Sequence, residues 1–306
     1  MGSENCPSVI TYTNIIQKCC GCNIIFKNTI ICDIFTTFVF SELLNMKVIY
    51  NKSWENQKIL SEKMLKIYSN DYNDYKYDYI LDINYIIKWE CISFRDYNEI
   101  KNKILLLSKK YNNILLRLSK VCKIHPHIIY DWYLKKNITN DIYTNKIRPK
   151  LHKLYYGDNN NNIENVISIH IRVGDLNEQL IKEGFTFQYY KNIIDTINKH
   201  FNIKINVYCE DNNYNHLIKL NELNNTNLFI GGINKFTEHF NNLVNSKILI
   251  LSPSSMSLFA GYLCNGLVLI DKKSYIWRKN VFNYSENIFK VFDNFSDEID
   301  LIRDYL

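Results

Sequence analysis

The sequence predicts an α/β fold whose C-terminal half is a doubly wound parallel sheet. Between residues 166 and 270, short apolar segments suited to buried strands alternate with segments of helical periodicity. Strands that alternate with helices at this spacing pair in parallel, because each crossover passes through a helix. The chain has 306 residues, of which 46% are hydrophobic, so it is large enough for two domains with cores of their own.

The first half of the chain is expected to form an α/β domain with extra helices over residues 1–158. Residues 23–31 are apolar and β-branched, residues 35–44 fit a helix and residues 47–50 fit a strand, which together suggest a βαβ unit. Residues 100–121 carry apolar side chains at helical spacing and predict a long helix.

A polar run at residues 158–162 marks the expected domain boundary, because one aspartate and four asparagines have no means of packing. The second domain is expected over residues 164–285. Its expected strands are residues 166–171, 203–208, 228–230, 247–251 and 267–270. Its expected helices are residues 187–201, 213–223, 235–245 and 255–264. Residues 286–306 are expected to form a helix that packs back on the first domain.

The composition argues against several classes of protein. The net charge of +6 is spread along the chain without a basic run, so no nucleic-acid partner is expected. The sequence has neither a signal-peptide pattern at its start nor 18 consecutive apolar residues, which predicts a cytoplasmic protein without a transmembrane segment. The nine cysteines are scattered, and the Cys-x-x-Cys at Cys19–Cys22 lacks a second pair of ligands, so we expect no metal site.

Polar residues follow four successive strands of the predicted second domain. They are Arg172, Gly174 and Asp175, then Glu210 and Asp211, then Gly231 and Gly232, then Ser252, Pro253, Ser254 and Ser255. The carboxyl ends of parallel strands meet at one edge of the sheet, and ligands bind in the crevice outside that edge. We therefore expect a ligand site there.

The residue types at this edge favour a phosphate ligand. Arg172 carries a planar, permanently charged fork that can bind phosphate through two parallel hydrogen bonds. His170 precedes Arg172 by two positions and so shares its face of the strand, although a single histidine on a strand is commonly a core residue. Glu210 and Asp211 fit either a cap for the next helix or a hydrogen-bond partner of a base or a sugar hydroxyl.

Serines open the helix predicted after the fourth strand. The backbone N–H groups of a first helical turn have no intrahelical partner, and together with the helix dipole they can hold a phosphate. Serine is also among the best N-cap residues, so Ser254 and Ser255 fit a purely structural role as well.

The polar motifs of residues 166–271, in the order in which they occur along the chain, resemble those of the α1,2-fucosyltransferases and their α1,6- and protein O-fucosyltransferase relatives. The resemblance covers residues 166–271. It rests on His-x-Arg-x-Gly-Asp at residues 170–175, the pair Tyr189-Tyr190 that leads a helix, the acidic pair Glu210-Asp211, and the run Ser254-Ser255-Met256-Ser257-Leu258-Phe259-Ala260-Gly261-Tyr262-Leu263. This last run is similar to the Ser-Ser-Phe-Ser motif of that family.

The resemblance implies two Rossmann-like domains facing each other, an arrangement of GT-B type. It implies a nucleotide-sugar site for GDP-fucose in residues 164–285, an acceptor side in residues 1–158, and inverting transfer of fucose to a glycan hydroxyl without a metal or another cofactor. Arg172 is implied to contact the β-phosphate beside Ser255 and the backbone of Met256, and His170 and Asp211 are implied to read the guanine. The expected donor site also includes Gly174, Glu210, Ser254 and Ser257, and the expected catalytic residues are Arg172 and Asp175.

Two departures from the family pattern keep other functions open. Residues 28–35 contain no glycine where the family has a glycine-rich turn, and Val173 replaces a second arginine that is common in the first motif. The alternatives are a related transferase that uses another nucleotide sugar, and a catalytically silent module that binds glycans or nucleotides.

Overall fold

The computed structural model divides the chain into two compact units, Met1–Tyr155 and Tyr156–Leu306. The structure describes residues 9–12, 47–48, 85–89, 114–118, 148–156, 163–173, 177–210, 215–231, 235–274 and 288–306, with a few single positions between 99 and 145. The predicted boundary at residues 158–162 lies outside these ranges, as do the strand predicted at residues 23–31 and the helix predicted at residues 35–44.

The first unit contains a parallel sheet of four short strands in the order β2-β1-β4-β3. The strands are β1 (Val9–Tyr12), β2 (Lys47–Val48), β3 (Tyr85–Trp89) and β4 (Ile114–Leu118). The predicted strand at residues 47–50 is confirmed in part as β2. Helix α5 (Arg148–Tyr156) ends at the division between the units and was not predicted.

The predicted helix over residues 100–121 is wrong in its second part. The described positions from 102 to 107 are helical, but Ile114–Leu118 forms β4, which pairs in parallel with both β1 and β3. A strand with neighbours on both sides in a parallel sheet reads as a nearly continuous apolar run, and Ile-Leu-Leu-Arg-Leu is such a run. A short apolar run also satisfies helical spacing, so periodicity alone could not separate the two structures.

The second unit is an α/β structure built on a parallel sheet of six strands, as predicted for the C-terminal half. The strands are β5 (Glu164–Ile171), β6 (Ile205–Cys209), β7 (Thr226–Ile230), β8 (Ser246–Leu251), β9 (Leu267–Asp271) and β10 (Phe289–Phe292). Their order is β10-β9-β8-β5-β6-β7. Read from β7 to β10 and counted within this unit, the order is 3-2-1-4-5-6, that of dinucleotide-binding doubly wound sheets.

The helices predicted for this unit are present. They are α7 (Phe187–His200), α8 (Asn215–Ile218) with a 3₁₀ turn at Lys219–Glu222, α9 (Phe236–Val244) and α10 (Ser255–Leu263). Helix α6 (Asn177–Lys182) adds a short element between β5 and α7 that was not predicted. Within the described ranges, no helix combines the length and the apolar character needed to cross a membrane.

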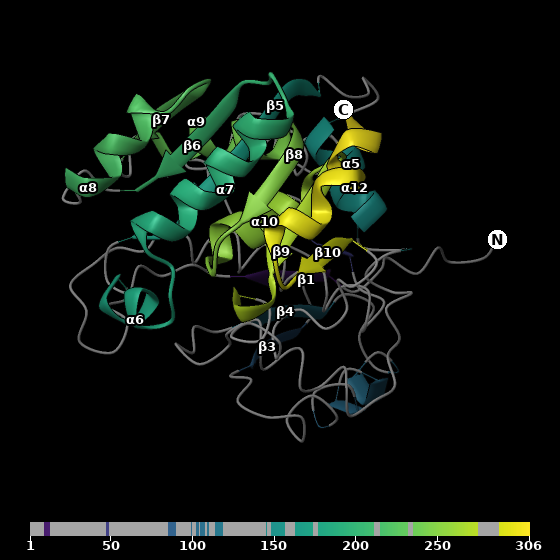
Figure 1. Cartoon of the computed structure of the whole chain (residues 1–306). Helices are drawn as coiled ribbons and strands as arrows, with labels where there is room; N and C mark the ends of the chain where they lie inside the picture. The colour runs from purple at the N-terminus through teal and green to yellow at the C-terminus, as the bar shows by residue number, and fades with distance from the viewer. Residues whose placement is uncertain are drawn as a thin grey trace. The chain divides into compact units, whose positions relative to one another are not determined.

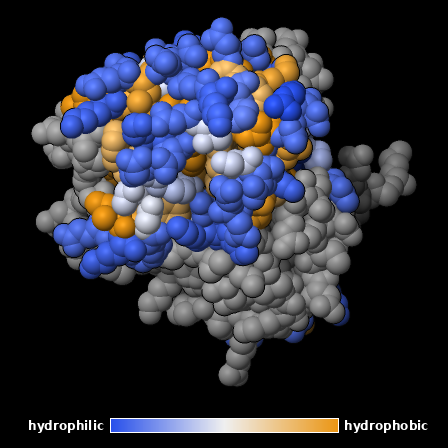
Figure 2. Space-filling model, viewed as in Figure 1, coloured by the Kyte–Doolittle hydropathy of each residue, from blue (hydrophilic) through white to orange (hydrophobic). Residues whose placement is uncertain are grey.

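Helix α7 covers one face of the sheet because its apolar side chains recur at helical spacing. The core on this face includes Ile167, Ile169 and Ile171 of β5, Ile193, Ile194 and Ile197 of α7, and Ile299 and Ile302 near the C-terminus. Figure 1 shows α7 and α12 (Ile299–Tyr305) on the near side of the sheet. Seen from the same side, the second unit presents mostly hydrophilic residues to solvent (Figure 2). Helices α9 and α10 contact each other and β8 on the other face.

The C-terminal segment differs from the single helix expected at residues 286–306. It forms β10, a 3₁₀ turn at Phe295–Glu298, and α12. β10 extends the sheet beside β9, and the buried Ile299 and Ile302 belong to the core of the second unit. The buried Phe289 and Phe292 are three positions apart, so they fit helical spacing as well as a short strand, and only the pairing of this segment with β9 decides between the two.

Gly266 lies between α10 and β9, where the chain passes close to the start of β8. A Cβ atom at this position would lie 2.2 Å from the carbonyl oxygen of Lys247 and 2.4 Å from that of Ser246. Backbone oxygens in a parallel strand cannot give way without breaking its pairing. This close approach explains why the turn needs glycine.

Replacing Gly266 with alanine should lower the free energy of unfolding by about 3 kcal/mol, because the new methyl group forces the β8 backbone to move. Gly261→Ala is the matched control: its Cβ would meet only side-chain carbons, at 3.0–3.1 Å, and alanine favours the α10 helix. Chemical denaturation of both variants measures the difference. Equal stability of the two variants would contradict the close-approach argument.

Candidate functional site

The candidate site lies at the carboxyl ends of β5 and β8, where the direction of the strand order reverses. β5 pairs with both β6 and β8, so it occupies the middle of the sheet. The chain moves from β5 toward β6 and β7, whereas from β8 it moves the opposite way toward β9 and β10. Loops that leave adjacent strands in opposite directions open a crevice, and ligands of doubly wound sheets bind in it.

A buried hydrogen bond joins the two strand ends beneath this crevice. The Nδ1 atom of His170 lies 2.6 Å from the hydroxyl oxygen of Ser252, and both residues are about 1% exposed. His170 was expected to read a guanine base, but its side chain lies below the surface and contacts Ser252. The sequence indicated Ser252 only as one of several polar residues after a strand; its pairing with His170 depends on the neighbouring positions of β5 and β8.

Ser257 strengthens the same contact from the first turn of α10. Its hydroxyl donates to the carbonyl oxygens of Ser252, at 2.8 Å, and Ser254, at 3.2 Å. The residue is fully buried, so its side chain holds the turn between β8 and α10. The sequence predicts Ser257 in the donor site, whereas the structure places its hydroxyl in this supporting layer.

Burial keeps His170 uncharged. Burial, together with the positive charges of Arg172 and His239, lowers the pKa of His170 from 6.5 to about 3. A neutral imidazole therefore lies under the site at neutral pH. The polar layer formed by His170, Ser252 and Ser257 therefore carries no net charge. Any charge at this edge of the sheet comes from other residues.

Arg172 and Glu210 form an ion pair across neighbouring strand ends. They directly follow Ile171 and Cys209, which are register partners in β5 and β6. Nη1 of Arg172 lies 2.6 Å from each carboxylate oxygen of Glu210. The Arg172 side chain is 10% exposed and the Glu210 side chain 30%, so the guanidinium is the deeper partner. Glu210 was expected as a helix cap or a ligand contact, and the structure pairs it with Arg172.

The first turn of α10 completes the site. Ser254 occupies the N-cap position, but its side chain makes no capping hydrogen bond. Its hydroxyl is buried and has no hydrogen-bond partner among the described residues. Met256 is 3% exposed, so its side chain is buried, and the expected contact of its backbone with a ligand stays a prediction. A buried hydroxyl without a partner among the described residues, at the start of a helix, is an unusual arrangement for a purely structural cap.

Asp271 is a buried carboxylate at the same sheet edge that sequence reasoning missed. It ends β9, accepts a hydrogen bond from the Tyr189 hydroxyl at 2.8 Å and another from the Lys273 N–H at 2.6 Å. Burial and the nearby Asp271 raise the pKa of Tyr189, so the phenol stays protonated. The rule that indicated the other strand ends applies to Asp271 as well, because it directly follows the predicted strand at residues 267–270, but only the four preceding strands were considered.

Several expected site residues cannot be placed. Gly174, Asp175 and Asp211 lie outside the described residues, as does the Cys19–Cys22 cluster, and the side chain of Ser255 is not described. Within the described part of the chain, no three His, Cys, Asp or Glu side chains gather in a way that could hold a metal ion.

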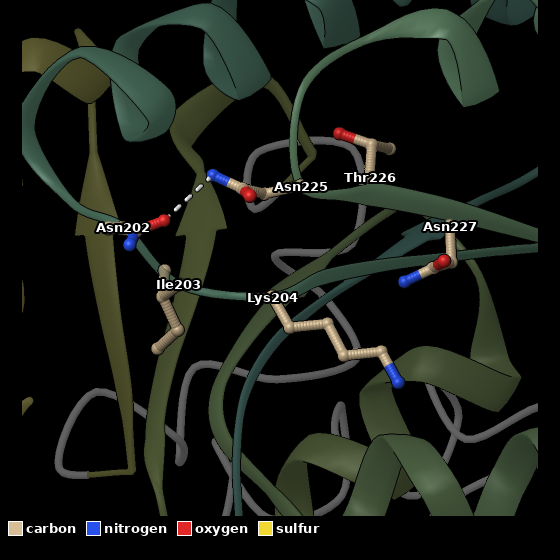
Figure 3. A pocket seen from close by; sticks show the side chains of 6 residues that line it. All are labelled: Asn202, Ile203, Lys204, Asn225, Thr226 and Asn227. Carbon is tan, nitrogen blue, oxygen red and sulfur yellow. Dashed lines mark hydrogen bonds between the residues drawn. The ribbon is translucent and has the colours of Figure 1, made fainter.

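A separate hollow of about 330 Å³ lies at the opposite edge of the sheet, where β6 and β7 begin (Figure 3). It is lined by Asn202, Ile203, Lys204, Asn225, Thr226 and Asn227. Figure 3 shows the Asn225 amide directed at Asn202, to whose side-chain oxygen it donates at 3.4 Å. The hollow is thus removed from the carboxyl edge, where doubly wound sheets bind their ligands.

The stability of the protein should depend on pH through His170. The unfolded chain takes up a proton near pH 6.5, whereas the folded protein resists protonation down to about pH 3, so stability falls as the pH drops through this window. The contribution to the slope approaches about 1.4 kcal/mol per pH unit. In His170→Asn, whose amide can replace Nδ1 in the contact with Ser252, this contribution should disappear.

Denaturant unfolding between pH 7 and pH 5 measures the slope. His200→Asn is the matched control, because it makes the same substitution at a histidine that is exposed at the end of α7. A wild-type slope in His170→Asn would show that His170 does not resist protonation in the folded protein.

Together these residues can bind an anion. A nearly buried guanidinium, the first turn of a nine-residue helix and an unpaired serine hydroxyl are found where β5 and β8 end, above a neutral polar layer. Helix N-termini and arginine forks are both suited to phosphate groups. Comparison of the chain with models of protein families, with curated proteins and with solved structures finds no match.

Proposed function

We propose that the protein is a glycosyltransferase that binds the diphosphate of a nucleotide sugar between Arg172 and the start of α10. One observation carries the proposal: β5 and β8 are adjacent at the point where the strand order reverses, and the His170–Ser252 hydrogen bond ties their ends together. This brings a fixed positive charge and a helix N-terminus to the same crevice. A diphosphate carries its charge on two linked groups and can engage both.

Each partner contributes differently to the proposed binding. Arg172 supplies a full positive charge in a poorly solvated position, where electrostatic attraction is stronger than in water. The first turn of α10 supplies backbone N–H groups and the positive end of the helix dipole. Ser254 adds a hydroxyl that gains a partner when a phosphate oxygen arrives, which removes the cost of leaving it unpaired.

The reaction that we propose is inverting transfer of fucose from GDP-fucose to a glycan hydroxyl. As the bond between the sugar C1 and the phosphate oxygen lengthens, negative charge grows on the β-phosphate and positive charge on the sugar ring. Arg172 and the α10 N-terminus then stabilise the transition state more than the bound substrate. Because these groups carry the leaving-group charge, the proposed reaction uses no metal or other cofactor.

The remaining parts of the proposal rest on the resemblance to the fucosyltransferases. Gly174 and Asp175 follow β5 in the sequence, and Asp175 is the proposed group to receive the acceptor proton or to fix the segment that it belongs to. Asp211 is proposed to recognise the guanine. His170, below the surface, is proposed to support the site through Ser252. The two units, each with a parallel sheet, are proposed to form a GT-B arrangement with the acceptor bound mainly by the first.

GDP should stabilise the protein against thermal unfolding more than UDP or dTDP does at equal concentration. A ligand at about a hundred times its dissociation constant adds about 2.7 kcal/mol of stability. Stabilisation by UDP or dTDP alone would reassign the donor to another nucleotide sugar. No stabilisation by any of the nucleotides or their sugars would overturn the proposal, and binding without release of GDP from GDP-fucose, across a panel of glycan acceptors, would favour a silent binding module.

Arg172→Ala should slow the release of GDP from GDP-fucose about a hundredfold or more, by analogy with the loss of other preorganised electrostatic donors. Lys272→Ala is the matched control, because Lys272 is an exposed cation at the same sheet edge and pairs with Asp293 after β10. It should retain the wild-type rate. Undiminished turnover in Arg172→Ala would remove this residue from the proposed mechanism.

A further inference from the structure

The Arg172–Glu210 ion pair occupies the guanidinium that the proposed function assigns to a phosphate. Both oxygens of the Glu210 carboxylate lie 2.6 Å from the same nitrogen, Nη1. A carboxylate and a phosphate make the same kind of charge-assisted hydrogen bond to a guanidinium. They therefore compete for this nitrogen, and two anions this close together also repel each other.

The pair has a clear role when no anion is bound. The Arg172 side chain is only 10% exposed, and a charge so far removed from water is costly unless an opposite charge compensates it. Glu210 supplies that charge and holds the guanidinium at the end of β5. A phosphate could later supply the same compensation in its place.

The two partners differ in their freedom to move. Arg172 follows β5, which has β6 on one side and β8 on the other, whereas Glu210 is three times as exposed, at 30%. The Glu210 carboxylate already borders solvent, so it is desolvated less deeply than the guanidinium and is the partner that can turn toward water when the pair opens. Exchange of partners therefore moves Glu210 and leaves Arg172 in position.

We propose that Glu210 is an internal substitute for the phosphate of the ligand, which holds Arg172 in place until an anion displaces it. This inference rests on the proposed function, because it assigns the displacing anion to the same crevice. Displacement requires a ligand with enough negative charge to replace a carboxylate, so Glu210 favours diphosphates over neutral or weakly charged ligands. It also lowers the affinity for every anion, because each must first break the ion pair.

The chain offers a matched control for this pair. Lys272 and Asp293 also follow adjacent parallel strands, β9 and β10, and their charged atoms lie 2.7 Å apart. Their side chains are 53% and 68% exposed, so water screens this pair strongly. Asp293→Asn removes one negative charge from the same sheet edge, as Glu210→Gln does, without touching Arg172.

Titration calorimetry with inorganic pyrophosphate and with GDP, at one fixed ionic strength, tests the inference. Glu210→Gln should bind pyrophosphate about tenfold more tightly than the wild type, because both the competition and the repulsion are removed. Asp293→Asn should bind it as the wild type does. The double variant Arg172→Ala/Glu210→Gln should lose the gain, which shows that it depends on the guanidinium.

The outcomes separate this inference from the proposed function. Equal or weaker pyrophosphate binding by Glu210→Gln overturns the substitute role, and GDP binding by the wild type then leaves the proposed function standing. Tighter pyrophosphate binding without any GDP binding supports the substitute role and overturns GDP-fucose as the donor. No binding of either ligand by any variant overturns both.

A measurement on the wild type covers the case in which Glu210→Gln does not fold. In crystals soaked with pyrophosphate, the Glu210 carboxylate should be displaced from Arg172 Nη1 and a phosphate oxygen should occupy its place. Pyrophosphate bound at the crevice with the ion pair still closed would contradict the inference.

Discussion

The hydrogen bond between His170 and Ser252 is the contact on which the carboxyl edge of the second unit depends. β5 and β8 pair along their length, but the chain leaves them in opposite directions, and this tends to separate the segments beyond the strand ends. The bond holds these ends together at 2.6 Å in a buried position. Because burial and Arg172 both disfavour the imidazolium, His170 ties the strands together without changing the charge of the crevice above it.

Much of the second unit could be predicted from the sequence, because the burial of its strands and helices determines where apolar residues occur along the chain. Strands covered on both faces are mostly apolar, which indicated β5 and β8, and α7 repeats its isoleucines at helical spacing. Alternation predicted that His170, in β5, and Arg172, directly after it, share one face. The same reasoning failed for β4, since its short, mostly apolar run fits either element and only pairing with β1 and β3 decides between them.

The partners of the site residues could not be predicted, because they depend on strand order and register. Glu210 meets Arg172 only because β6 lies beside β5, and Ser252 meets His170 only because β8 lies on the other side. Sequence reasoning considered each polar residue alone, as a cap or a ligand contact. In the folded chain, the strongest of these groups already bind one another, and this pairing keeps a nearly buried arginine stable.

The two sides of the crevice therefore differ in what an anion must displace in order to bind. Arg172 is paired and must exchange Glu210 for a phosphate, so the affinity gained there is the difference between two similar contacts. The Ser254 hydroxyl has no partner among the described residues, so it gains a hydrogen bond without losing one. An anion that reaches only the arginine therefore gains little, whereas one that spans both the arginine and the start of α10 gains from the second contact in full. The site therefore favours a ligand with two linked phosphates, because the protein itself supplies a partner for Arg172 but none of its described residues pairs with the Ser254 hydroxyl.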